Sequence, residues 1–162
     1  MGLSEQQLLF FKDSLDEICK VDRVLQMGSF TQHGNVSCLH HSISVAYVSY
    51  AVAIKFHLKV NLKSLIKGAL LHDFFLYDWE TEKLNPMRHL RIHPHIALEN
   101  ASAYFSISDV ERDIIVKHMW PIGLGIPRYL ESFIVNIADT SCAAFEFMHV
   151  FSSFKGLAKV LN

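Results

Sequence analysis

The spacing of apolar residues constrains the fold of this chain more than any other feature. Leu8, Phe11, Leu15 and Ile18 recur at helical spacing near the N-terminus, and similar spacing returns in most later segments. No segment combines sustained apolar–polar alternation with flanking turn residues, the pattern typical of a strand. With 162 residues, 51% of them hydrophobic, the chain has the size of one domain with its own core. We therefore predict an all-α fold, a single helical bundle of about six or seven helices over residues 1–162.

Capping and helix-breaking residues give approximate bounds for these helices. A serine followed three residues later by Gln or Glu, as at Ser4 and Ser108, predicts a helix start. Pro94 suits the first turn of a helix, whereas Asn85–Pro86 is interpreted as a breaker. The first predicted helix begins at Ser4. Further helices are predicted over about 36–57, 62–75, 94–105, 108–120 and 128–148, followed by a shorter C-terminal helix. A loop is predicted over 27–35 and irregular chain over 77–91.

The charge balance and the cysteines narrow the class of protein. Fifteen basic and sixteen acidic residues give no overall positive field that would hold nucleic acid or an anionic membrane. Cys19, Cys38 and Cys142 form no CxxC pair, which argues against a disulfide framework and a cysteine-based zinc site. No secretory signal or membrane-spanning stretch is recognised. We expect a cytoplasmic protein without a nucleic-acid or membrane partner, and the phenylalanine-rich termini allow a homodimer.

Ten histidines in so short a chain are the feature that points to function. His72 and Asp73 lie in the apolar segment GALLHDFF, near the end of a predicted helix. Histidine and aspartate rarely enter a protein core unless they are paired or bind a metal ion. The pair is therefore the first candidate for a metal site.

Four more residues combine a ligand side chain with an apolar or helix-end position. His41 lies in HHSISVAYVSYAV, Asp139 in FIVNIADTSCAAF and His118 in DIIVKHMW, while His93 directly precedes Pro94. Imidazole and carboxylate ligands suit one or two divalent first-row transition ions. The sequence does not choose among Fe, Mn, Ni and Zn.

These residues, in this order, resemble the motif of the HD superfamily of metal-dependent phosphohydrolases. The matching stretches lie within about residues 33–147 and are HSISVA from His41, LLHD from Leu70, HPHIALENA from His93, His118, and IADTSCAAFE with Asp139. The six-ligand pattern is similar to the dinuclear branch, which includes symmetrical diadenosine tetraphosphate hydrolases, HD-GYP-type phosphodiesterases and oxygenases akin to myo-inositol oxygenase. The resemblance implies one ion held by His41, His72, Asp73 and Asp139, and a second that Asp73 bridges to His93 and His118.

The resemblance also implies a hydrolase. A metal-bound hydroxide would attack the phosphorus of an ester or anhydride in a small nucleotide-like substrate, because two divalent ions can orient the nucleophile and offset the charge of the departing oxygen. His89 or Asp78 is expected to shuttle a proton.

The sequence departs from this family pattern after the HD pair. Many dinuclear members carry a lysine there that helps to bind phosphate, but Phe74, Phe75 and Leu76 follow here. A phosphate needs some other cationic or backbone donor. The candidates for that role are Arg88, Arg91, Lys117 and Arg128.

Several alternatives stay open at this point. His40 competes with His41, although the family spacing favours His41, and both His89 and His95 compete with His93. A hydrogen-bonded cluster without metal is the structural alternative to a metal site. The functional alternatives are a dinuclear iron oxygenase, which the same ligands would suit, and a non-catalytic helical sensor or adaptor.

Overall fold

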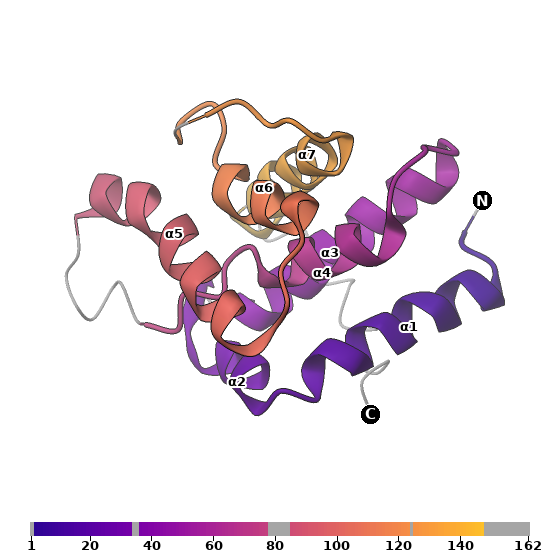
Figure 1. The fold of residues 1–162 in the computed structure, drawn as a ribbon, viewed down its shortest axis with the longest axis horizontal. Coiled ribbons are helices and arrows are strands. Elements are labelled where there is room, and N and C mark those ends of the chain that lie inside the picture. Colours follow the sequence, from indigo (N-terminus) through magenta and orange to yellow (C-terminus); the bar gives the residue numbers. More distant parts are fainter. Residues whose placement is uncertain (1, 34–35, 78–84, 124, 148–162) are drawn as a thin grey trace.

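The computed structural model describes residues 2–33, 36–77, 85–123 and 125–147. Helices dominate these ranges, with one short antiparallel pair of strands (Figure 1), so the predicted all-α fold is confirmed. The elements are α1 (Glu5–Cys19), α2 (Asp22–Leu25), the 3-10 helix η1 (Gln26–Ser29), β1 (Thr31–His33), β2 (Val36–Ser37), α3 (Cys38–Lys55), α4 (Leu62–Leu71), α5 (Pro86–Tyr104), α6 (Asp109–Lys117) and α7 (Leu130–Phe147).

Local capping explains where most helices begin. The side chains of Ser4 and Ser108 each accept a hydrogen bond from the backbone three residues later, in complete capping boxes. Ser37 and Asn61 cap α3 and α4 in the same manner. The starts that the sequence predicts at Ser4 and Ser108 are therefore correct.

Helix α5 begins at Pro86, eight residues before the start that the sequence predicts at Pro94. The Asn85 side chain accepts hydrogen bonds from the backbone of Met87 and Arg88, and Pro86 occupies the first helical position. An Asn–Pro pair ends a helix that precedes it but begins one that follows it, because proline's missing N–H is not needed in the first turn. Pro94 consequently lies inside α5, and His93 lies within the helix instead of preceding it.

The other bounds differ more modestly from the prediction. Helix α4 ends at Leu71 instead of near residue 75, and α6 ends at Lys117 instead of 120. Part of the predicted loop over 27–35 forms η1 and β1, and β1 pairs with β2. The predicted C-terminal helix lies in 148–162, outside the described residues.

Helix α4 forms the centre of the core. Leu65, Ile66, Leu70 and Leu71 on this helix have no exposed surface. Figure 1 shows α3 and α4 running through the middle of the molecule, with α1 on one side and α6 and α7 on the other. The C-terminal ends of α4 and α6 lie close to α3, α5 and α7. Side chains from distant parts of the sequence therefore come together beside these two helix ends.

Within the described ranges, none of the helices combines the length and the hydropathy needed to cross a lipid bilayer.

Candidate metal centre

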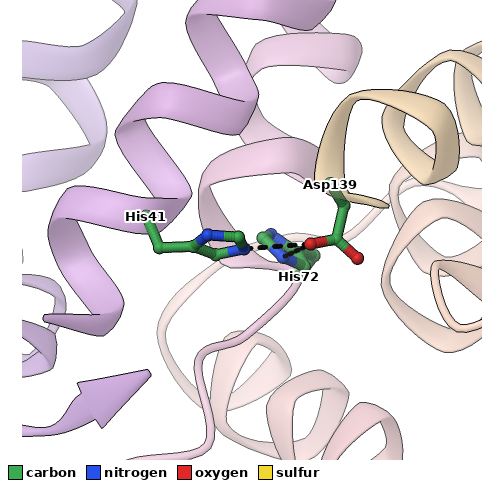
Figure 2. A group of neighbouring side chains, drawn as sticks. All are labelled: His41, His72 and Asp139. Atoms are coloured by element: carbon green, nitrogen blue, oxygen red, sulfur yellow. Dashed lines mark hydrogen bonds and ion pairs between the residues drawn. The ribbon is translucent and has the colours of Figure 1, made fainter. Parts of the chain in front are cut away.

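Six side chains converge where these helices meet. His41 comes from α3, His93 from α5 and Asp139 from α7, while His72 and Asp73 follow the last residue of α4 and His118 follows α6. Asp139 is half-buried, and the other five are at most 2% exposed. Figure 2 shows His41, His72 and Asp139 pointing toward one another. The structure thus brings together all six residues that the sequence selects as metal ligands.

Asp73 lies between two sets of imidazoles. Its Oδ2 atom is 3.1 Å from His72 Nε2 and 4.0 Å from His41 Nε2. Its Oδ1 atom is 3.2 Å from His93 Nε2 and 3.4 Å from His118 Nε2. One carboxylate therefore presents a different oxygen to each set, as a ligand that bridges two ions would.

Asp139 completes the first set. Its Oδ1 atom lies 2.9 Å from His41 Nε2 and 3.8 Å from His72 Nε2. Ligand atoms of these three residues lie within 4.8 Å of one another, a separation at which one cation can contact all of them.

In three of the imidazoles, the hydrogen-bond partner of Nδ1 shows that this nitrogen carries a proton. A carbonyl oxygen only accepts hydrogen bonds, so an Nδ1 atom that contacts one carries the proton, and a neutral ring then has a lone pair at Nε2. The Nδ1 atoms donate to backbone carbonyls about one helical turn earlier: His72 to Ala69 (2.7 Å), His93 to His89 (3.0 Å) and His118 to Ile115 (2.8 Å).

In a neutral ring such a lone pair would point at other acceptors. For His72 the metal-free protein avoids this: burial alone would lower the pKa of the ring, but Asp73 and Asp139 raise it well above its usual value. The Nε2 atoms of His93 and His118 are 2.8 Å apart, so they need either an extra proton or a cation between them. The buried Nε2 of His72 and Oδ1 of Asp73 take part in no hydrogen bond, although each has an ion-pair contact at 3.1–3.4 Å. Unsatisfied buried acceptors are costly. A group of converging acceptors therefore fits one or two divalent cations.

The helix ends support the same conclusion. The carbonyls at the C-terminus of an α-helix carry a partial negative charge. Helices α4 and α6 both end immediately before a ligand, His72 and His118 respectively. Their negative ends therefore favour positive charge near the centre.

Glu146 is a part of the site that the sequence analysis missed. His41 Nδ1 donates to Glu146 Oε2 at 2.9 Å, and Glu146 is buried. A carboxylate on the far nitrogen fixes the ring and makes the other nitrogen a better metal ligand. Glu146 lies seven residues after Asp139, two turns along the same helix, and that spacing is the signal that would have identified it.

The carboxylates remain ionised even without metal. Burial alone would raise the pKa of Asp73, but the neighbouring imidazoles of His72, His118 and His93 hold that pKa well below its usual range. His41 and His72 lower the pKa of Asp139 in the same way, against the effect of burial. Both aspartates are thus in the form that binds cations.

His41 is charged in the metal-free protein. Burial alone would lower its pKa, but hydrogen bonds from the ring to Asp139 and Glu146 raise it to about 9. Binding a metal at Nε2 would displace one proton and leave the other on Nδ1, where Glu146 accepts it.

Two further contacts position Asp73. The side chain of Gln32, on β1, donates from Nε2 to Asp73 Oδ2 at 2.6 Å. Cys38 Sγ donates to the Asp73 backbone carbonyl at 3.0 Å. Gln32 falls in the segment predicted to be a loop, and only the pairing of β1 with β2 brings it here, so local sequence gives no signal for it.

A cavity of about 420 Å³ opens beside the centre. Its lining includes Asp73, His93, His118 and Asp139, so a small molecule in the cavity would meet the candidate ligands directly. The apolar residues of its lining, here called the apolar wall, are Leu90, Met119, Trp120, Pro121, Ile122 and Ala143.

One of the two predicted proton shuttles lies at this cavity. His89 lines it, stacks on His93 with ring centroids 4.7 Å apart, and shares a 2.8 Å hydrogen bond between its Nδ1 and the Tyr77 hydroxyl. Asp78, the other candidate, lies outside the described residues.

The predicted phosphate-binding cations are elsewhere. Lys117 Nζ lies 2.6 Å from Asp113 Oδ1 and donates to the Ile126 carbonyl, so its charge is already paired. Arg88, Arg91 and Arg128 are exposed, and none of them is among the residues that line the cavity. All four therefore lie outside the described lining of the cavity, and their role in binding phosphate stays a prediction from the sequence.

The competing histidines also differ in position. His40 is only partly buried and His95 is exposed. His41 and His93, the residues preferred from the sequence, are the ones whose nitrogens reach the centre.

No family model, curated protein or solved structure matches this chain in the comparisons made. Function must therefore be inferred from the residues and their geometry.

Proposed function

We propose that the protein is a metal-dependent phosphohydrolase of the HD type. It binds one or two divalent transition-metal ions (Fe, Mn, Ni or Zn) and hydrolyses a phosphate ester or anhydride of a small nucleotide-like molecule. The observation that carries the proposal is the position of Asp73, whose two oxygens face separate pairs of imidazoles. Two carboxylate oxygens and four imidazole nitrogens gathered at these distances form a ligand set that suits divalent first-row ions.

Each ligand has a defined task in this proposal. His41, His72 and Asp139, with Asp73 Oδ2, would hold one ion, and His93 and His118, with Asp73 Oδ1, would hold the second. When bound, a pair of such ions lowers the pKa of water and offsets the charge that develops around phosphorus. Glu146 and Gln32 keep His41 and Asp73 in place.

His89 is the described residue best placed to move a proton. It lies at the cavity next to His93, and Tyr77 holds its Nδ1 atom. A neutral ring whose Nδ1 accepts from Tyr77 carries its proton on Nε2, from which it can be donated to a leaving oxygen. Its variant His89→Asn should slow turnover while the metal content stays unchanged.

The test is the metal content of freshly purified protein, followed by assays with phosphomonoesters, phosphodiesters, nucleotides and dinucleotides after each metal is restored. We expect bound transition metal and metal-dependent release of phosphate or a nucleotide. Protein that holds metal but hydrolyses none of the panel would contradict the hydrolase and favour a sensor or adaptor. Protein that neither binds metal nor changes on chelation would contradict the metal centre itself.

A dinuclear iron oxygenase is the second candidate, and one observation favours it. The cavity wall is largely apolar, and no lysine or arginine is found among its described residues, which suits an uncharged substrate. Turnover that requires both iron and dioxygen, and stops under anaerobic conditions, would select this function.

The proposal also includes a reducing compartment, the cytoplasm, because Cys19, Cys38 and Cys142 are all free thiols. A homodimer and the absence of nucleic-acid and membrane partners stay predictions from the sequence.

A further inference from the structure

The apolar wall of the cavity holds no metal ligand, so its composition bears on what else the site binds. Trp120 is 36% exposed and Ile122 is 60% exposed, and both line the same cavity as the candidate ligands. Exposed apolar surface beside a polar centre is typical of a ligand site, where it receives an apolar part of the ligand.

Side chains of α7 support Trp120, one residue of the apolar wall. The Asn136 side chain on α7 donates to the backbone carbonyl of Trp120 at 2.6 Å, and the Trp120 ring packs edge-on against Phe133 with centroids 6.1 Å apart. These contacts restrain the Trp120 backbone and one edge of its ring before any ligand arrives, which reduces the entropy lost on binding.

The charge of the cavity is equally informative. None of its lining residues, so far as the structure describes them, is a lysine or an arginine. Asp73 and Asp139 also cancel part of the positive charge that bound ions would bring. Each further phosphate on a ligand adds negative charge, and a buried charge without a partner is costly. The cavity is thus matched to a ligand of low charge.

We propose that the substrate is an organic ester of a single phosphate with an apolar or aromatic group, and that Trp120 and Ile122 receive this group. The inference rests on the proposed phosphohydrolase function and specifies its substrate. In the hydrolysis, the bond between phosphorus and the ester oxygen breaks, an oxygen of water bonds to phosphorus, and a proton of that water ends on the released alcohol or phenol. A cavity of about 420 Å³ accommodates a molecule with one ring and one phosphate.

The test measures binding, not turnover, by calorimetry on zinc-loaded protein with phosphonates that cannot be hydrolysed. Benzylphosphonate should bind about tenfold more tightly than methylphosphonate, because its ring is buried against Trp120. A carboxylate on the far end of the ring should weaken binding about tenfold relative to a methyl group at the same place, because no cation there pairs with it.

Variants test whether Trp120 causes the preference for the ring-bearing phosphonate. Trp120→Ala should reduce the preference for the ring to about threefold or less, and Trp120→Phe should restore most of it. Ile126→Ala is the matched control, because Ile126 is an exposed apolar residue of the same connection that does not line the cavity. The zinc content of all three should equal that of the wild type.

Equal binding of the benzyl and methyl compounds, or tighter binding of the carboxylate, would overturn the inference. So would a ring preference that Trp120→Ala leaves intact. Efficient hydrolysis of nucleoside triphosphates or diadenosine tetraphosphate would overturn it while sustaining the proposed function. Ring-dependent binding without any hydrolysis would contradict the proposed function and leave only the assignment of the apolar group to Trp120 and Ile122. Protein that holds none of Fe, Mn, Ni and Zn would contradict both.

Discussion

Gly68 on α4 and Ile114 on α6 touch one helical turn before His72 and His118, the two ligands that follow these helices. A Cβ atom at position 68 would lie 2.6 Å from Ile114 Cδ1 and 3.0 Å from its Cβ. The imidazoles of His72 and His118 lie 4.8 Å apart between ring centroids. The close approach that glycine allows therefore fixes the spacing of the ligands one turn later.

Gly68→Ala should lower both stability and metal affinity. The added methyl group overpacks the contact with Ile114, which typically costs about 1–3 kcal/mol, and moves the two ligands apart. Thermal unfolding and metal titration measure the two effects. In a Gly68→Ala background, Ile114→Ala should cost less than it does in the wild type, and additive effects of the two changes would contradict the explanation.

Single ligand variants should separate the two ions. Asp73→Asn removes the charge shared by both sets, so metal per protein should fall close to zero. His93→Ala removes a ligand of one set only and should leave about half of the metal, if two ions bind. Elemental analysis measures both, and His57→Ala, at an exposed histidine, is the control that should retain full metal. Equal metal in all three variants would contradict the ligand assignment.

Glu146→Gln should weaken metal binding without removing a ligand. The amide can still accept from His41 Nδ1, but it lacks the charge that strengthens the imidazole as a donor to metal. Changes to such supporting groups typically reduce affinity about 10–100-fold. Competition with a chelator measures the loss, and Glu99→Gln, at an exposed site on α5, is the control. Unchanged affinity would show that Glu146 serves stability alone.

Asp113→Asn should destabilise the protein in a pH-dependent manner. Asp113 accepts from the backbone of Arg128 and Tyr129 and from Ser132 Oγ, and it pairs with Lys117, so it ties the start of α7 to α6. Burial opposes ionisation, but these contacts lower its pKa below the usual value near 3.8. Hydrogen bonds to a charged group contribute about 1.5–3 kcal/mol, which sets the expected loss.

The sign of the pH effect follows from the lowered pKa. The stabilisation by Asp113 is complete above the unfolded pKa and is lost as pH falls through the folded pKa. The difference in unfolding free energy between wild type and Asp113→Asn should therefore be constant above about pH 5 and shrink below about pH 4. Urea unfolding across this range measures it, and a difference that grows toward acid would contradict the assignment.

Local chemistry accounts for what could be predicted from the sequence. Helix starts at Ser4 and Ser108 depend on residues three positions apart, so the sequence reveals them. The same kind of local reasoning misread Asn85–Pro86, because the pair stops one helix and starts another with equal ease. Which of the two happens depends on the packing of the helix that follows.

The candidate site also contains some residues that the sequence predicts and others that it does not. His72 and Asp139 stand out because their sequence neighbours are apolar, and the structure places both at the centre. Gln32 reaches Asp73 only through a strand pair, and Lys117 turns to Asp113 instead of the cavity. The first contact joins segments far apart in the sequence, and the second depends on which of several nearby partners the lysine contacts. A local sequence pattern predicts neither.

The order of the ligands along the chain has a consequence for biosynthesis. His41 is on α3, whereas Asp139 and the supporting Glu146 are on α7, the last helix of the described residues. A growing polypeptide on the ribosome therefore has its early histidines and the HD pair exposed before their carboxylate partners exist. The complete set of candidate ligands therefore exists only after α7 has been synthesised.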